Sequence, residues 1–171
     1  IAMLGITGDR AASQRDAESG DTAMRAAAID GLGRIREPED FRLLKAASDE
    51  PNADWRVHLA AAFALANQGK VDTDQFSPLP YLVESLNTNG RANSASAYLK
   101  ELTRHEDARA GMIKLLPETT KDQKLKLCEV FGASHSDDML PALKKLSKDG
   151  DPDVAFAASK AIRILQARAS S

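Results

Sequence analysis

The 171-residue chain carries 23 basic and 25 acidic residues, a formal net charge of −2, and 43% hydrophobic residues. This balance argues against a nucleic-acid-binding domain, which is usually strongly basic. No apolar run approaches the roughly 20 residues that span a bilayer. Aromatic residues make up only 5%, which favours closely packed helices over a β-sandwich. A single cysteine, Cys128, excludes an intramolecular disulfide and a zinc site built on several cysteines.

The start of the chain predicts a defective first repeat, which either is degenerate or lacks some of its residues. Residues 3–5 resemble the end of a helix, and residues 10–20 are too polar for a helix that packs in a hairpin. Because the chain lacks an initiator methionine and begins with a helix-like pattern, we expect it to be a fragment of a longer protein. Its cellular location is therefore not predicted.

Five later stretches share one pattern, and each is predicted to be the second helix of a helical hairpin. They lie near 21–35, 52–68, 87–103, 120–133 and 151–168. Each opens on a residue suited to capping a helix N-terminus, namely Asp21, Asn52, Asn87, Thr120 and Asp151. Each closes an apolar stripe at helical spacing with a large side chain, namely Leu32, Phe63, Tyr98, Phe131 and Ile162.

Shorter amphipathic segments between these stretches predict the first helices of the hairpins. They run over 39–48, 78–86, 107–116 and 137–148. The longest connector, 67–77, is polar. Because one hairpin cannot bury its apolar face alone, we expect neighbouring hairpins to stack and share a continuous core.

The repeat resembles the HEAT-repeat family, particularly the short bacterial repeats that include the phycobilisome lyase-like group. The resemblance rests on Asp21, Met24-Arg25 and Leu32-Gly33, and on Asp151-Pro152-Asp153-Val154, and it extends over about 21–165. It implies an all-α fold, a right-handed α-solenoid of about five HEAT-type helical hairpins, forming a single domain over 1–171.

The resemblance in fold implies a non-catalytic scaffold that binds another protein on the concave surface lined by the second helices. The mixed signs of the charges along the repeats argue against nucleic acid as the partner. No cofactor is expected. Two alternatives stay open. One is an accessory domain packed on a catalytic domain elsewhere in the parent protein, for which an exposed apolar patch at 1–4 would speak. The other is a lyase-like domain that handles a ligand, for which converging polar groups around a deep pocket would speak.

Four basic residues recur at the same place in consecutive repeats and form the candidate interaction surface. They are Arg25, Arg56, Arg91 and Lys124. They could bind an acidic peptide, or each could bond to a carboxylate or carbonyl of the next repeat. We favour this structural ladder, because an arginine beside a packed surface usually has a fixed partner.

Trp55 is the other candidate for a partner contact, although packing against a neighbouring hairpin is the simpler interpretation. His105-Glu106 is one histidine–glutamate pair, whereas a metal site needs several converging ligands. Cys128 falls at a core position and is expected to be a small buried hydrophobe. We therefore predict no catalytic, metal or cofactor site.

Overall fold

The computed structural model describes residues 9–169, and every regular element in that range is a helix. The all-α class is therefore confirmed for the described residues. The features predicted for residues 1–5 lie outside them. Within that range, no helix is both long and apolar enough to cross a membrane.

The five predicted second helices are all present. They are α3 (Thr22–Ile35), α5 (Trp55–Asn67), α7 (Ala92–Leu102), α9 (Lys121–Ala133) and α11 (Pro152–Ala169). The first helices are α4 (Phe41–Asp49), α6 (Pro78–Glu84), α8 (Glu106–Leu115) and α10 (Leu140–Leu146). Single 3-10 turns flank them at η1 (Pro38–Asp40), η2 (Ser85–Asn87), η3 (Leu116–Glu118) and η4 (Asp137–Met139).

One further helix corrects an expectation. Residues 10–20 were expected to be too polar for a packed helix, yet α2 spans Arg10–Asp16 and packs against α3. Two of its polar side chains bond to a residue far along the chain. Arg10 Nε donates to the buried carboxylate of Asp40 at 2.9 Å, and Gln14 donates to the same carboxylate at 2.6 Å.

Three of the five predicted N-caps are confirmed. Asp21 and Thr120 accept hydrogen bonds from first-turn amides, and Asp151 accepts from the amide of Val154. The predictions for Asn52 and Asn87 are wrong. Asp54 caps α5 instead, and Asn87 lies inside η2.

Asn87 does not cap α7 because a turn separates it from that helix. Gly90 has a φ of 87°, a left-handed conformation that other residues rarely adopt. The turn delays the start of α7 to Ala92, and its N-cap position holds Arg91, which makes no side-chain cap.

The described residues form two compact units. Unit 1 comprises residues 9–72 and 76–81, and unit 2 comprises residues 73–75 and 82–169, so that the boundary passes through α6. The prediction of one domain over the whole chain stays a prediction, as does the solenoid arrangement.

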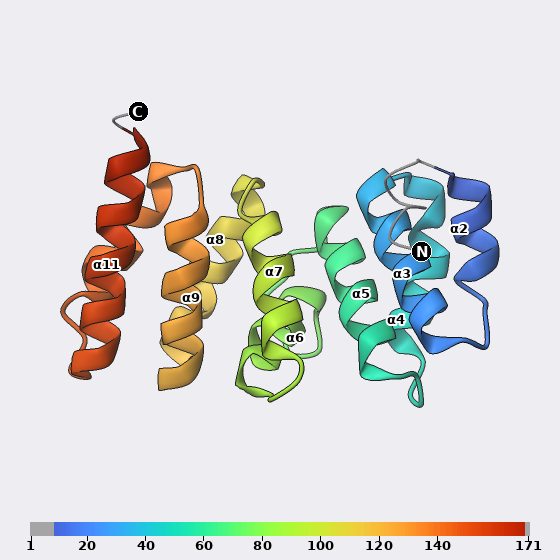
Figure 1. The fold of residues 1–171 in the computed structure, drawn as a ribbon, viewed down its shortest axis with the longest axis horizontal. Helices are drawn as coiled ribbons and strands as arrows, with labels where there is room; N and C mark the ends of the chain where they lie inside the picture. Colours follow the sequence, from blue (N-terminus) through green and yellow to red (C-terminus); the bar gives the residue numbers. More distant parts are fainter. Residues whose placement is uncertain (1–8, 170–171) are drawn as a thin grey trace. The chain divides into compact units, whose positions relative to one another are not determined.

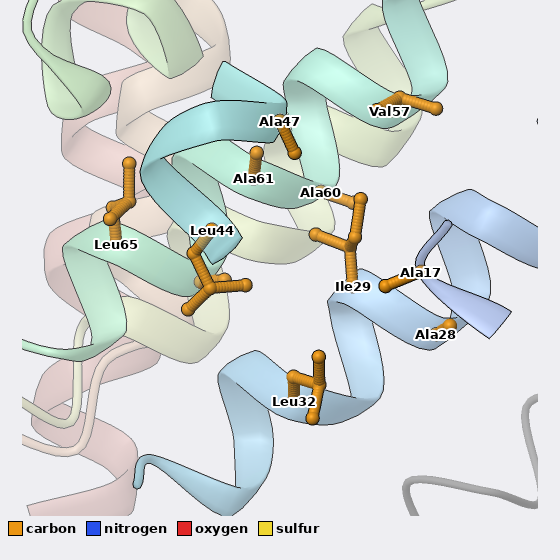
Figure 2. Packing of buried hydrophobic residues seen from close by; sticks show 11 residues of the cluster. Ala17, Ala28, Ile29, Leu32, Leu44, Ala47, Val57, Ala60, Ala61 and Leu65 are labelled. Atoms are coloured by element: carbon orange, nitrogen blue, oxygen red, sulfur yellow. The ribbon is translucent and has the colours of Figure 1, made fainter. Parts of the chain in front are cut away.

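Unit 1 is built on α3 and α5, with α2 packed on α3 and α4 packed on α5 (Figure 1). Figure 2 shows the side chains of its core gathered between these helices. The buried cluster comprises Ala17, Ala28, Ile29, Leu32, Leu44, Ala47, Val57, Ala60, Ala61, Ala64 and Leu65. Alanine is frequent in the cluster because the two long helices approach each other closely.

Helices α3 and α5 approach each other closely at a glycine. A Cβ atom added to Gly33 would lie 2.5 Å from the Cβ and 2.6 Å from the Cα of Ala64. Asn67, buried at the end of α5, donates from Nδ2 to the Gly33 carbonyl at 2.9 Å. The backbones of α3 and α5 therefore meet at a position that only glycine fits.

Unit 2 repeats this arrangement. Helix α9 packs against α7 on one side and α11 on the other, and α10 packs on α11 (Figure 1). A Cβ added to Gly132 of α9 would lie 3.1 Å from the Cβ of Ala161, and Arg168 donates to the Gly132 carbonyl at 3.1 Å.

Large residues fill the core of unit 2. Its fully buried side chains include Leu99, Leu102, Met112, Leu127, Val130, Phe131, Met139, Leu143 and Val154. Among the large residues predicted to close the apolar stripes, Leu32, Phe63 and Phe131 are fully buried. Tyr98 and Ile162 are only partly buried.

Candidate functional site: a groove on the second helices of unit 2

The four basic residues of the candidate interaction surface, which we call the basic column, have different partners. Arg25 on α3 donates from Nε to the carbonyl of Ala17 at 3.0 Å and forms a two-pronged ion pair with Glu50, at the end of α4. The hydrogen bond from Arg25 holds the pKa of the Glu50 carboxyl below its ordinary value. Arg25 thus links α3 to the end of α2 and to the end of α4.

Lys124 makes the equivalent contact in unit 2. Its Nζ lies 2.8 Å from the carboxylate of Asp149, which follows α10 and stands 25 residues further along the chain, as Glu50 does from Arg25. The hydrogen bond from Lys124 lowers the pKa of Asp149. Arg25 and Lys124 therefore make the contacts that a structural ladder predicts.

Arg56 and Trp55 behave differently. Arg56 pairs at 3.2 Å with Asp54, the N-cap of its own helix, and its guanidinium lies 4.8 Å from the centre of the Trp55 ring. The Arg56 side chain is 54% exposed. Arg91 is half-buried at the N-cap position of α7. The structure therefore does not give these four cations one common environment.

His58 and Cys128 both make contacts inside the fold. His58 bonds through Nε2 to the carbonyl of Glu50 at 2.6 Å and meets the ring of Tyr81 edge-on. No cluster of three or more potential metal ligands occurs among residues 9–169. Cys128 is buried, and desolvation raises the pKa of its thiol to about 11, so that the reactive thiolate is scarce at neutral pH.

One groove in the described part of unit 2 lies on its second helices. This groove has a volume of about 680 Å³, and α7, α9 and α11 contribute most of its wall. Small side chains make up much of the lining, namely Ala92, Gly132, Ala133, Ala157 and Ala161. We call it the second-helix groove.

One face of α11 supplies a wall of the groove that carries exposed apolar side chains. Phe156, Lys160, Ile164 and Arg168 follow one another at intervals of four residues, so they share a helical face, and all four line the groove. Phe156 is 66% and Ile164 is 39% exposed. Phe76 is the one other large apolar side chain exposed among the described residues.

Charged side chains of both signs line the groove. Lys126 pairs with Glu129 of its own helix at 3.8 Å, and Asp122 lies in the first turn of α9. Lys100 and Lys160 make no side-chain ion pair with any described residue. A lining of apolar and small residues together with charges of both signs is suited to contact with a protein surface.

Neither Phe156 nor Ile164 was among the predicted site residues. A signal for them was present in the sequence, since the interval of four residues that unites the exposed stripe differs in phase from the buried positions Val154, Ala158 and Leu165. Among the predicted site residues, none lines this groove.

No protein-family model matches the chain, and no curated protein sequence matches it significantly.

Proposed function

We propose that the chain is a non-catalytic protein-interaction domain that holds a partner in the second-helix groove of unit 2. The observation that carries this proposal is the exposed stripe of Phe156 and Ile164 beside a groove of small side chains. Exposed apolar side chains that lie together beside a groove are typical of interaction sites, and aromatic residues are enriched at such interfaces.

We further propose that the hairpins are HEAT-type repeats stacked in a right-handed solenoid. Support comes from devices that recur in both units. An ion pair links a second helix to the turn before the next second helix. A glycine of a second helix faces an alanine of the next second helix. An arginine of a first helix pairs with an aspartate in the 3-10 turn before the next first helix. The recurring pairs are Arg25–Glu50 and Lys124–Asp149, Gly33–Ala64 and Gly132–Ala161, and Arg10–Asp40 and Arg109–Asp138.

We favour protein binding over a lyase-like, ligand-handling role because exposed apolar side chains line the groove and its charged side chains are of both signs. Cys128 lines the groove but is buried with a raised thiol pKa, which disfavours a covalent role. An accessory domain would use the same stripe against a neighbouring domain. The patch expected to favour that role, 1–4, lies outside the described residues.

Affinity capture from a cell lysate with three matched baits tests the proposal. The baits are the native chain, Phe156→Asp, and Phe76→Asp, which places the same charge at an exposed phenylalanine away from the groove. Circular dichroism and thermal melting first establish that all three are folded.

We expect one or more proteins to be recovered by the native chain and Phe76→Asp and lost with Phe156→Asp. Equal recovery by all three baits would show that the groove is not the binding surface.

A further inference from the structure

A second groove lies on the first helices of unit 2. It has a volume of about 630 Å³, and its walls come from the end of α8, from η3 and from α10, with Lys124 of α9. The lining residues are Ile113, Leu116, Pro117, Lys124, Ala142, Lys144, Lys145, Leu146, Lys148 and Asp149. We call it the lysine groove. It shares no lining residue with the second-helix groove.

Apart from one internal ion pair, the charged side chains that line the lysine groove are all basic. Asp149 is the one acidic residue in the described lining, and Lys124 neutralises it at 2.8 Å. Lys144, Lys145 and Lys148 are exposed, and their ammonium groups pair with no described carboxylate. Three positive charges therefore stand uncompensated around the groove.

The floor between these lysines is aliphatic and recessed. Leu116, Ala142 and Leu146 are 9%, 8% and 7% exposed, so each shows a small area at the bottom of the groove. Ile113 is half-buried, and Pro117 is exposed beside it. An occupant would thus meet aliphatic carbon below and ammonium groups at the rim.

Stabilisation of the α10 C-terminus explains only part of this arrangement. Cations in a last helical turn interact favourably with the helix dipole, which accounts for Lys144 and Lys145. Lys148 lies beyond the helix, and the dipole gives no reason for an open aliphatic floor beside three lysines.

We propose that the lysine groove binds an acidic protein segment that carries aliphatic side chains. Acidic side chains complement the rim, and aliphatic side chains fill the floor, so that charge steers the encounter and burial holds the segment. A membrane surface fits less well, because Leu116, Ala142 and Leu146 expose too little area to insert into a bilayer. A nucleic acid fits less well, because no aromatic residue in the described lining can stack on a base.

Fluorescence anisotropy with a defined probe tests this proposal on the full chain. The probe is a short fluorescein-labelled peptide of glutamate and leucine, and its controls are a peptide with glutamine in place of glutamate and a peptide with serine in place of leucine. We expect saturable binding of the first peptide, weakened at least about tenfold in either control and by added salt. Amide chemical shifts in labelled protein should change around Ile113, Leu116 and Leu146.

Two matched variants locate the site. Lys144→Glu/Lys148→Glu reverses two rim charges and should weaken binding of the acidic peptide at least about tenfold. Lys100→Glu/Lys160→Glu makes the same charge change at lysines of the second-helix groove and should leave it unchanged. Native melting temperatures in both variants keep the comparison valid, and the shift map on the native chain does not depend on either.

Several results would overturn the proposal. They are no saturable binding, equal loss in both variants, shifts confined to α7 and α11, or preferential binding of anionic vesicles or an oligonucleotide of equal charge. The proposed function fails on a different observation, namely capture that is indifferent to Phe156→Asp, so either proposal can fail without the other.

Discussion

The two pairs of second helices, α3 with α5 and α9 with α11, use the same contacts and leave different surfaces. In each pair, a glycine of the earlier helix faces an alanine of the later helix. A cation of the earlier helix also pairs with a carboxylate in the turn before the later helix. Helix α5 is buried at Val57 and at every position from Leu59 to Asn67. Helix α11 leaves Phe156 and Ile164 exposed.

This difference separates what builds the fold from what is available for recognition. The shared contacts are close, fixed and internal, so changes there are expected to alter stability. The exposed face of α11 contributes little to the core, so changes there are expected to alter binding. Substitutions at the shared contacts should therefore change stability, and the glycines should show the strongest change.

Substituting the interhelical glycines should give the largest and most unequal effects. An added methyl at Gly33 meets both Cβ and Cα of Ala64 below 3.0 Å, so Gly33→Ala must push α3 and α5 apart and should cost about 1–3 kcal/mol of unfolding free energy. At Gly132 the contact is 3.1 Å, and the gain of about 1 kcal/mol in helix propensity should largely offset it.

Urea denaturation of both variants measures this difference. Ala64→Gly should not rescue Gly33→Ala, because the Cα of Ala64 remains 2.6 Å from the added methyl. Equal stability of Gly33→Ala and the native chain would show that α3 and α5 are not so close.

Removing the basic side chains of the column one at a time should lower stability by amounts that depend on their partners. Arg25→Met loses a hydrogen bond to the Ala17 carbonyl, worth about 1 kcal/mol, in addition to its ion pair with Glu50. Lys124→Met loses one ion pair and should cost less. Arg56→Met should have almost no effect on the thermal midpoint, because Arg56 is exposed and pairs only within its own helix start. A larger loss for Arg56 than for Arg25 would contradict the ladder.

The carboxylates of the two ion pairs should make stability depend on acid pH. The folded-state pKa of Glu50 lies below its ordinary 4.5, and that of Asp149 below its ordinary 3.8. Because the folded pKa is depressed, the stabilisation is present above the ordinary pKa and is lost as pH falls through the folded value.

Melting temperatures should therefore fall below about pH 4.5, and less steeply in Glu50→Gln and Asp149→Asn than in the native chain. Parallel curves for all three proteins would mean that these pairs are absent in solution.

Reaction of the cysteine should be the smallest effect. Cys128 is 1% exposed with a thiol pKa raised to about 11, so about one molecule in a thousand carries a thiolate at pH 8. We expect slow labelling by a disulfide reagent in native conditions and fast labelling in urea. Labelling at the unfolded rate without denaturant would show that α9 and α11 are loosely packed.

The sequence predicted most helices because helix signals are local. Apolar spacing and capping residues act over three or four positions, and Asp21, Thr120 and Asp151 behave as that chemistry requires. Helix α2 was missed because its polar side chains depend on Asp40, a partner about 30 residues away. No local pattern could supply that contact.

The candidate site was harder to predict for the same reason. Which face of a helix stays uncovered depends on its neighbours, so the repeat drew attention to Arg25, which is used inside the fold, and away from Phe156. The four-residue interval of Phe156 and Ile164 was visible, but only packing distinguishes an exposed stripe from a buried one.

Hydrogen exchange of the chain, with and without a partner captured by the native bait, locates the binding surface. We expect slower exchange in α9 and α11 on binding, no change in α3, and no protection in Phe156→Asp. Protection confined to α3 and α5, or equal protection in native chain and variant, would contradict a binding surface on the second-helix groove of unit 2.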